Sequence, residues 1–145
     1  MAEAILNRQA QGRIVAHSAG SRPAARVNPL AIETLREYGI EWAGHAPRSA
    51  DLLAREPWDF VITVCDRAKE SCPIFPGQPM LAHWGMPDPA AVEGDETARR
   101  AAFRDTHCLL SRRIDLLLAL PLECLERLAL EARVRAIGAP ESETV

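Results

Sequence analysis

The stretch "VITVCDRAKESCPIFP", residues 61–76, decides the fold and raises the question of function. Its first residues belong to an apolar run, "DFVITV", that has no polar alternation through its middle. Such a run is typical of a strand buried on both faces of a parallel sheet. The run is followed at once by Cys65, and Cys72 comes later with Pro73 directly behind it. Two thiols at this spacing could bind a metal, form a structural disulfide, transfer electrons or simply pack.

The composition is that of an ordinary soluble globular protein. The chain has 145 residues, of which 48% are hydrophobic and 26% are charged, and this is enough for one domain with a sizeable core. A formal net charge of −3 does not suggest a nucleic-acid surface. No apolar run approaches the roughly 20 residues that cross a bilayer, and the start, "MAEAILNRQAQG", lacks the features of a secretory signal. We therefore expect a cytoplasmic protein that binds neither nucleic acid nor membrane.

Predicted strands and helices alternate along the chain. Asn28 followed by Pro29 marks the beginning of one helix, and Ser49 marks the beginning of a short one. Gly12 and Gly39 lie just past the ends of two helices. The predicted strands cover residues 13–20, 59–64 and 80–85, and a proline-rich loop covers 65–79. The predicted helices cover residues 1–12, 28–39, 49–56, 95–120 and 122–138.

This alternation predicts an α/β fold in which a parallel sheet is layered between helices on both faces. We expect a domain over residues 1–120, a helical extension over 121–138 and a disordered tail over 139–145. Ligands in such folds gather at the carboxyl ends of the strands, and Cys65 lies at one of these ends.

The long helix over residues 95–120 has one apolar stripe, formed by Phe103, Leu110, Ile114 and Leu117. His107 lies on the same stripe, so we expect a core histidine there. Cys108 and Cys124 fall in predicted helices, and we expect both to be buried as small hydrophobic residues.

The C-terminal helix carries a second apolar stripe, which supports an alternative function as an interaction module. Its members are Leu122, Leu125, Leu128 or Ala129, and Ala132. The stripe either packs on its own domain or forms the seam of a homodimer.

The residues alone leave the role of Cys65 and Cys72 open, but they favour a redox pair. A structural zinc site needs about four ligands, and no second thiol pair or histidine cluster completes one. A permanent disulfide is disfavoured in a reducing cytosol. Two unrelated buried cysteines remain possible. A redox pair fits better, because Arg67 and Lys69 lie between the thiols and can stabilise the thiolate form that attacks.

Several segments together resemble the thioredoxin-coupled arsenate reductases, which are built on the low-molecular-weight tyrosine phosphatase fold. The resemblance is specific in "VITVCDRAKESCPIFP" followed by "LAHWGMPDPA", which combines Cys-x6-Cys-Pro, His-Trp-Gly and Asp-Pro. The segments "MAEAILN", "HSAG" and "VNPLAIETLREYGI" are similar to the same family, and the likeness extends from residue 1 to about 120.

The resemblance implies a thiol relay without a bound cofactor or metal. A first cysteine in a Cys-x5-Arg loop attacks arsenate, and Cys65 then attacks that cysteine and releases arsenite. Cys72 attacks Cys65 and passes the disulfide to thioredoxin. Asp88 matches the aspartic acid that protonates the leaving oxygen, although as a residue on its own it reads as an Asp-Pro turn. The phosphate-like substrate also leaves aryl phosphatase activity as an alternative for the complete protein.

The resemblance covers four further positions less firmly. His83 and Trp84 match the family and are expected to support the loop rather than to react. Glu3 and Ser18 match positions where some relatives hold a monovalent cation, but "HAPRS", residues 45–49, departs from the polar stretch that helps there.

The Cys-x5-Arg loop itself is not in the sequence. The positions six residues after the four cysteines hold Ser71, Gln78, Ile114 and Leu130, and none is arginine. In the family this loop directly precedes "MAE", so we expect the loop and the first strand to be missing from the chain. Met1 is then an internal methionine of a protein about 15–20 residues longer. A truncation, or an inactive descendant that binds a partner, is the alternative explanation.

Overall fold

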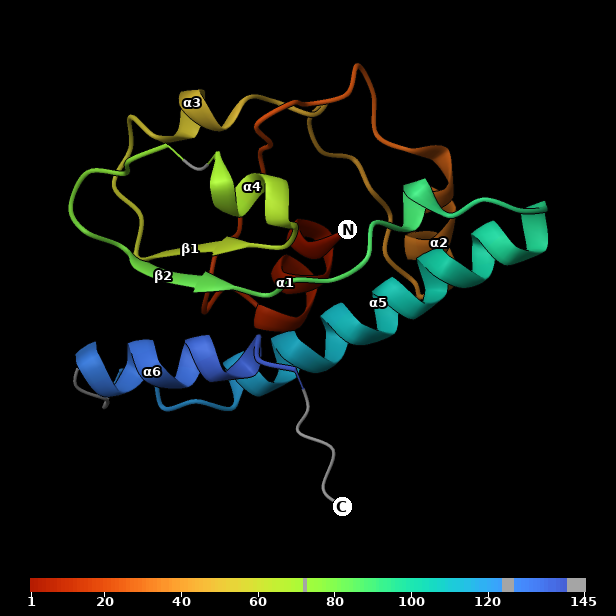
Figure 1. The fold of residues 1–145 in the computed structure, drawn as a ribbon. Helices are drawn as coiled ribbons and strands as arrows, with labels where there is room; N and C mark the ends of the chain where they lie inside the picture. Colours follow the sequence, from red (N-terminus) through yellow and green to blue (C-terminus); the bar gives the residue numbers. More distant parts are fainter. Residues whose placement is uncertain (72, 124–126, 141–145) are drawn as a thin grey trace.

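The computed structural model describes residues 1–71, 73–123 and 127–140, with all their side chains except those of Arg67 and Leu128 (Figure 1). Cys72, Cys124, Leu125 and the end of the predicted tail therefore lie outside the described residues. The helices are α1 (Ala2–Ala10), α2 (Pro29–Glu37), α3 (Ala50–Leu53), α4 (Asp66–Glu70), the 3-10 helix η1 (Pro89–Ala91), α5 (Glu96–Leu118) and α6 (Arg127–Ile137). The strands are β1 (Phe60–Thr63) and β2 (Met80–His83).

The two strands form a parallel sheet, as the sequence predicts. Their register pairs Phe60 with Met80 and Thr63 with His83. In Figure 1, α6 runs below the strands and α4 lies above them, so helices are found on both faces. β1 is only half-buried along its length, and the expected burial on both faces is therefore wrong. The reason is that the sheet has two strands in the described part of the chain, so β1 is an edge rather than a central strand.

The strand predicted over residues 13–20 is also wrong. Residues 13–19 form no ladder, and the segment makes only an isolated bridge between Gly20 and Ser49. The side chain of Asn7 bonds both backbone groups of Ala16 instead, accepting from the N–H at 2.8 Å and donating to the carbonyl at 3.0 Å. A strand requires a neighbouring strand, and here a side chain from α1 takes the place of one.

Helices α2 and α3 begin at the capping residues that the sequence predicts, and Asp95 caps α5 in the same way. The side chains of Asn28, Ser49 and Asp95 accept hydrogen bonds from backbone N–H groups in the first turns of α2, α3 and α5. Ion pairs then join α2 to α5. Arg104 donates to both carboxylate oxygens of Glu37, at 2.9 and 3.1 Å, and Arg100 pairs with Glu33.

The core lies where α1, α2, α5 and α6 meet. Its most completely buried side chains are those of Ile5, Leu35, Ile114, Leu117 and Val134. No helix of the described residues is both long and apolar enough to cross a bilayer.

The stripe predicted on α5 is confirmed, and it includes the core histidine. His107 is buried and its ring stacks on Tyr38 with centroids 3.7 Å apart, while burial lowers the pKa of the imidazole. Cys108 is exposed, which contradicts its expected burial. Each residue turns about 100° around a helix, so the neighbour of a buried residue points away from the core.

The buried face of α6 differs from the predicted stripe. Ala129 and Ala132 are exposed, whereas Leu130 and Val134 are buried against the rest of the domain. The four-residue spacing of Leu130 and Val134 places both on the side that faces β2 and α5. This packing makes α6 part of the core, and a homodimer through the helix stays a prediction.

The end of α6 is fixed by close packing against the end of β2. The indole N–H of Trp84 donates to the Val134 carbonyl at 3.1 Å in a buried contact. A Cβ atom at Gly138 would lie 2.5 Å from Cδ1 of Trp84 and closer still to the carbonyl oxygen of His83. Only glycine fits here without displacing β2 or α6.

We expect Gly138→Ala to lower the free energy of unfolding by about 1–3 kcal/mol, because the methyl group overpacks this contact. Chemical denaturation measures the change. Gly20→Ala is the matched control, because the nearest atoms to a Cβ there lie 3.9 Å away. Equal stability of the two variants would contradict the assigned packing.

Candidate functional site

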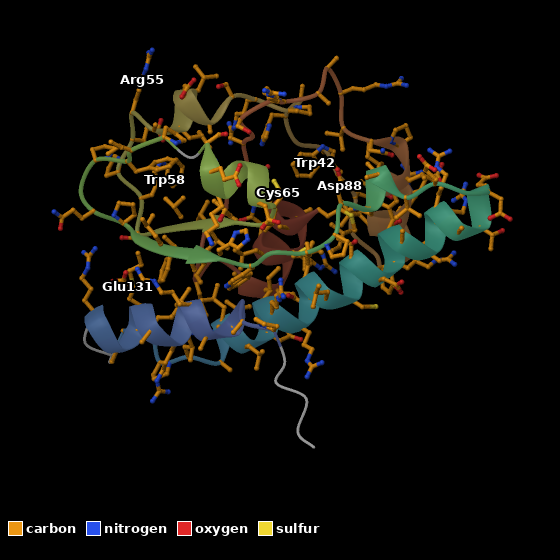
Figure 2. All side chains as sticks on the ribbon, in the orientation of Figure 1. Trp42, Arg55, Trp58, Cys65, Asp88 and Glu131 are labelled. Atoms are coloured by element: carbon orange, nitrogen blue, oxygen red, sulfur yellow. The ribbon has the colours of Figure 1, made fainter. Side chains whose placement is uncertain are left out.

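Cys65 lies where β1 gives way to α4, two residues after the strand ends (Figure 2). It is a free, exposed cysteine. Its sulfur accepts a hydrogen bond from the Ala68 N–H at 3.4 Å, and its carbonyl accepts one from the Lys69 N–H at 3.1 Å. The thiol is thus held at a strand end while solvent still reaches it.

The loop predicted over residues 65–79 is wrong in its first part, since residues 66–70 form α4. The sequence "DRAKE" contains the signal, because Ala, Arg, Lys and Glu favour helix and Asp66 suits a first turn. Lys69 of this helix is exposed. The side chain of Arg67 is not among those described.

His83 braces the segment that carries Cys65. Its Nδ1 lies 2.7 Å from the hydroxyl of Thr63 on β1, and its Nε2 lies 3.1 Å from a carboxylate oxygen of Asp66 on α4. The two partners flank Cys65 in sequence. A Cβ atom at Gly85 would lie 2.8 Å from the ring, so glycine leaves the room that the ring occupies. The structure therefore gives His83 the supporting contacts expected of it.

Asp88 caps the short helix η1. Its carboxylate accepts a hydrogen bond from the Ala90 N–H at 2.9 Å, and the residue is exposed. This is the geometry of an Asp-Pro turn. No hydrogen bond joins Asp88 to Cys65 in the described part of the chain.

A pocket of about 640 Å³ lies between the start of α1 and the turn that Asp88 caps. Met1 and Ala90 line it from these two elements. The remaining wall comes from three chain segments, and it includes Ser18, Arg26, Asn28, Trp42, His45 and Arg48. The lining includes the guanidinium groups of Arg26 and Arg48 and the carboxylate of Glu3.

Glu3 stands in this wall and is held by two other segments. The Ser18 hydroxyl donates to one carboxylate oxygen, and Nε2 of His45 lies 2.9 Å from the same oxygen and 3.2 Å from the other. Burial acts to raise the pKa of Glu3, but the hydrogen bonds from Ser18 and His45 outweigh it and lower the pKa. No local pattern in the sequence indicates the contact with His45, which lies 42 residues away. No cluster of three metal-ligating side chains exists among the described residues.

The chain matches the model of the low molecular weight phosphotyrosine protein phosphatases over residues 1–134, and it belongs to that family. Its similar relatives include arsenate reductases. It is 34% identical over 88 residues to one from Halalkalibacterium halodurans, which covers 61% of this chain and 63% of the relative. It is 38% identical over 80 residues to arsenate reductase 2 of Staphylococcus epidermidis, and this match covers 55% of this chain and 61% of the relative.

The matches with these relatives span less than two thirds of their length. Among solved structures, an arsenate reductase in its oxidized state superposes with a TM-score of 0.67 at 24% identity, covering 81% of this chain and 85% of the other. An arsenate reductase in its reduced state superposes with a TM-score of 0.61. These superpositions confirm the predicted fold.

We expect Thr63→Val to loosen the support of Cys65, because the change keeps the shape of the strand residue and removes the hydroxyl that meets His83. The loss of this hydrogen bond costs about 0.5–1.5 kcal/mol and speeds amide hydrogen exchange across α4. Hydrogen exchange followed by mass spectrometry measures the exchange rate of the α4 amides.

Thr106→Val is the control, since the Thr106 hydroxyl bonds only the Ala102 carbonyl within its own helix. If α4 exchanges at the same rate in both variants, His83 does not brace this segment.

Proposed function

We propose that the complete protein reduces arsenate to arsenite by a thiol–disulfide relay through Cys65 and Cys72. The observation that carries the proposal is the free, exposed Cys65 at the carboxyl end of β1, in a Cys-x6-Cys-Pro sequence. The 34–38% identity to arsenate reductases supports it. Ligands of parallel α/β sheets collect at this end of the strands.

The relay balances in three steps. A nucleophilic thiol displaces water from arsenate and forms a sulfur–arsenic(V) bond. The Cys65 thiolate attacks that sulfur, a disulfide forms, and the departing electron pair reduces arsenic to arsenite. Cys72 then attacks Cys65, which frees the nucleophile as a thiol and leaves a Cys65–Cys72 disulfide. A dithiol protein such as thioredoxin reduces this disulfide and is itself oxidised.

No cysteine of residues 1–145 has an arginine six residues later, so the proposal takes the nucleophile from outside this stretch. We place it in a Cys-x5-Arg loop ahead of Met1 in the complete protein. The pocket between the start of α1 and the Asp88 turn supports this placement, since Met1, which such a loop would directly precede, lines it. The coding sequence directly upstream of Met1 should therefore contain an in-frame Cys-x5-Arg motif. Its absence would favour an inactive protein that binds a partner.

Mild oxidation of the 145-residue chain should produce an intramolecular Cys65–Cys72 disulfide. In the complete protein, Cys65→Ser and Cys72→Ser should each abolish arsenate turnover, because serine cannot carry the oxidising equivalent. Peptide mapping by mass spectrometry and arsenite release measure the two effects.

Cys108→Ser is the matched control, because Cys108 is equally free and exposed but lies on α5. It should leave both the disulfide and the turnover unchanged. Full turnover with either relay cysteine replaced would refute the proposal.

Asp88→Asn should separate the capping role of Asp88 from a role as proton donor. Asparagine caps a turn as well as aspartate does, so the melting temperature should stay unchanged. Turnover should fall by about 10²- to 10⁴-fold, because the amide cannot protonate the leaving oxygen.

Asp88→Ala is the comparison for the cap, and it should additionally cost up to about 1 kcal/mol of stability. If Asp88→Asn turns over arsenate at the wild-type rate, Asp88 serves only the turn.

Phosphatase activity is the second candidate, and the family match favours it specifically. Hydrolysis of an aryl phosphate would use the same nucleophile and Asp88 but not Cys65 or Cys72. A complete protein that hydrolyses aryl phosphate equally well with and without its relay cysteines, and does not reduce arsenate, would be a phosphatase.

A further inference from the structure

The carboxylate of Glu3 meets hydrogen-bond donors from two segments far away in sequence. Its side chain is only 11% exposed. The Ser18 hydroxyl donates to one oxygen, and the His45 ring lies within hydrogen-bond distance of both. Both carboxylate oxygens of Glu3 therefore already have hydrogen-bond partners within the protein.

The contacts of His45 are both satisfied by a positively charged ring. Nδ1 lies 2.7 Å from the backbone carbonyl of Ala46, which can only accept a hydrogen bond. Nε2 lies 2.9 Å from the Glu3 carboxylate, which also only accepts. Both contacts are hydrogen bonds only when each ring nitrogen carries a proton, that is, in the imidazolium form.

Arg48 supplies a second positive charge to the same wall. Its Nε donates to the Ser18 carbonyl at 3.1 Å, and a terminal nitrogen lies 3.2 Å from Nδ1 of His17. The backbone nearby is joined as well, because the Gly20 N–H donates to the Arg48 carbonyl at 3.0 Å. Arg48 thus holds the 17–20 segment to the 45–50 segment.

These contacts do not fit a bound monovalent cation, although Glu3 and Ser18 match cation positions of some relatives. An alkali cation needs several oxygen ligands whose lone pairs are free to face it. Here the Glu3 carboxylate faces an imidazolium, and the Ser18 carbonyl faces a guanidinium. A further cation would stand beside two positive charges and would have to displace their hydrogen bonds.

We propose that His45 and Arg48 replace the monovalent cation in this protein, so that the wall formed by Glu3 and Ser18 binds no alkali ion. The two side chains supply the charge that ties residues 17–20 and 45–48 to α1. Since the same residues line the pocket at the start of α1, the protein keeps this pocket in shape with its own charges.

The test compares melting temperatures in KCl, NaCl and choline chloride at equal ionic strength. The wild-type chain should melt at the same temperature in all three salts. Arg48→Ala and His45→Gln should each lower the melting temperature by about 3–6 °C, because each removes a charged hydrogen bond. Their double variant should recover part of the loss in KCl or NaCl but not in choline chloride, because the oxygens of Glu3 and Ser18 are then free.

Two further measurements keep the test decisive if the double variant does not fold. Arg48→Lys retains a positive charge and should remain insensitive to the choice of salt. In nitrogen-15 spectra of the wild type at mildly acidic pH, His45 should show two protonated ring nitrogens, and its signal is identified by its loss in His45→Gln.

The proposal is overturned if KCl or NaCl stabilises the wild type relative to choline chloride. It is equally overturned if His45 has a neutral ring in the spectra, or if Arg48→Ala and His45→Gln both leave the melting temperature unchanged.

Discussion

The buried indole of Trp84 is the contact on which the rest of the structure depends. Its ring N–H donates to Val134 on α6, and its backbone N–H donates to Thr63 at the end of β1 at 2.7 Å. Its carbonyl accepts from Arg113 on α5 at 2.9 Å. A buried polar group left unpaired costs about 1–3 kcal/mol, so these three elements are held in one arrangement. Because β1 ends here, the position of Cys65 follows from the same contact.

The parts of the fold that the sequence predicts correctly are those set by short-range chemistry. The Asn28 and Ser49 caps act on backbone groups within three residues, and each marks a helix that forms. The failed strand over 13–20 depends on a partner far away in sequence, and no pattern inside the segment shows whether one exists. Asn7 illustrates the difficulty, since a single side chain replaces the missing backbone partner.

The features of the candidate site fall into the same two groups: some follow from the local sequence, and others depend on partners far away in the chain. Cys65 could be placed at a strand end from the sequence, because "DFVITV" is clear and the cysteine follows it directly. The cap made by Asp88 is also visible as an Asp-Pro turn. The support from His83 could be expected from the family resemblance, but its partners and the contact between His45 and Glu3 could not, since they join residues 17–42 positions apart through the folded chain. The periodicity of a sequence predicts the face of a helix or strand on which a side chain lies, but it does not predict which residue that side chain contacts.

The two histidines show how partners decide the charge that a site carries. Thr63 can donate to His83, so a neutral ring satisfies both of its contacts, and no second charge is required beside Cys65. The backbone N–H of Ala68 on α4 donates a hydrogen bond to that sulfur. His45 faces two acceptors and needs both protons. The chain thus closes the pocket wall with a paired histidine and carboxylate, and it holds the thiol segment with a histidine whose two contacts require no charge.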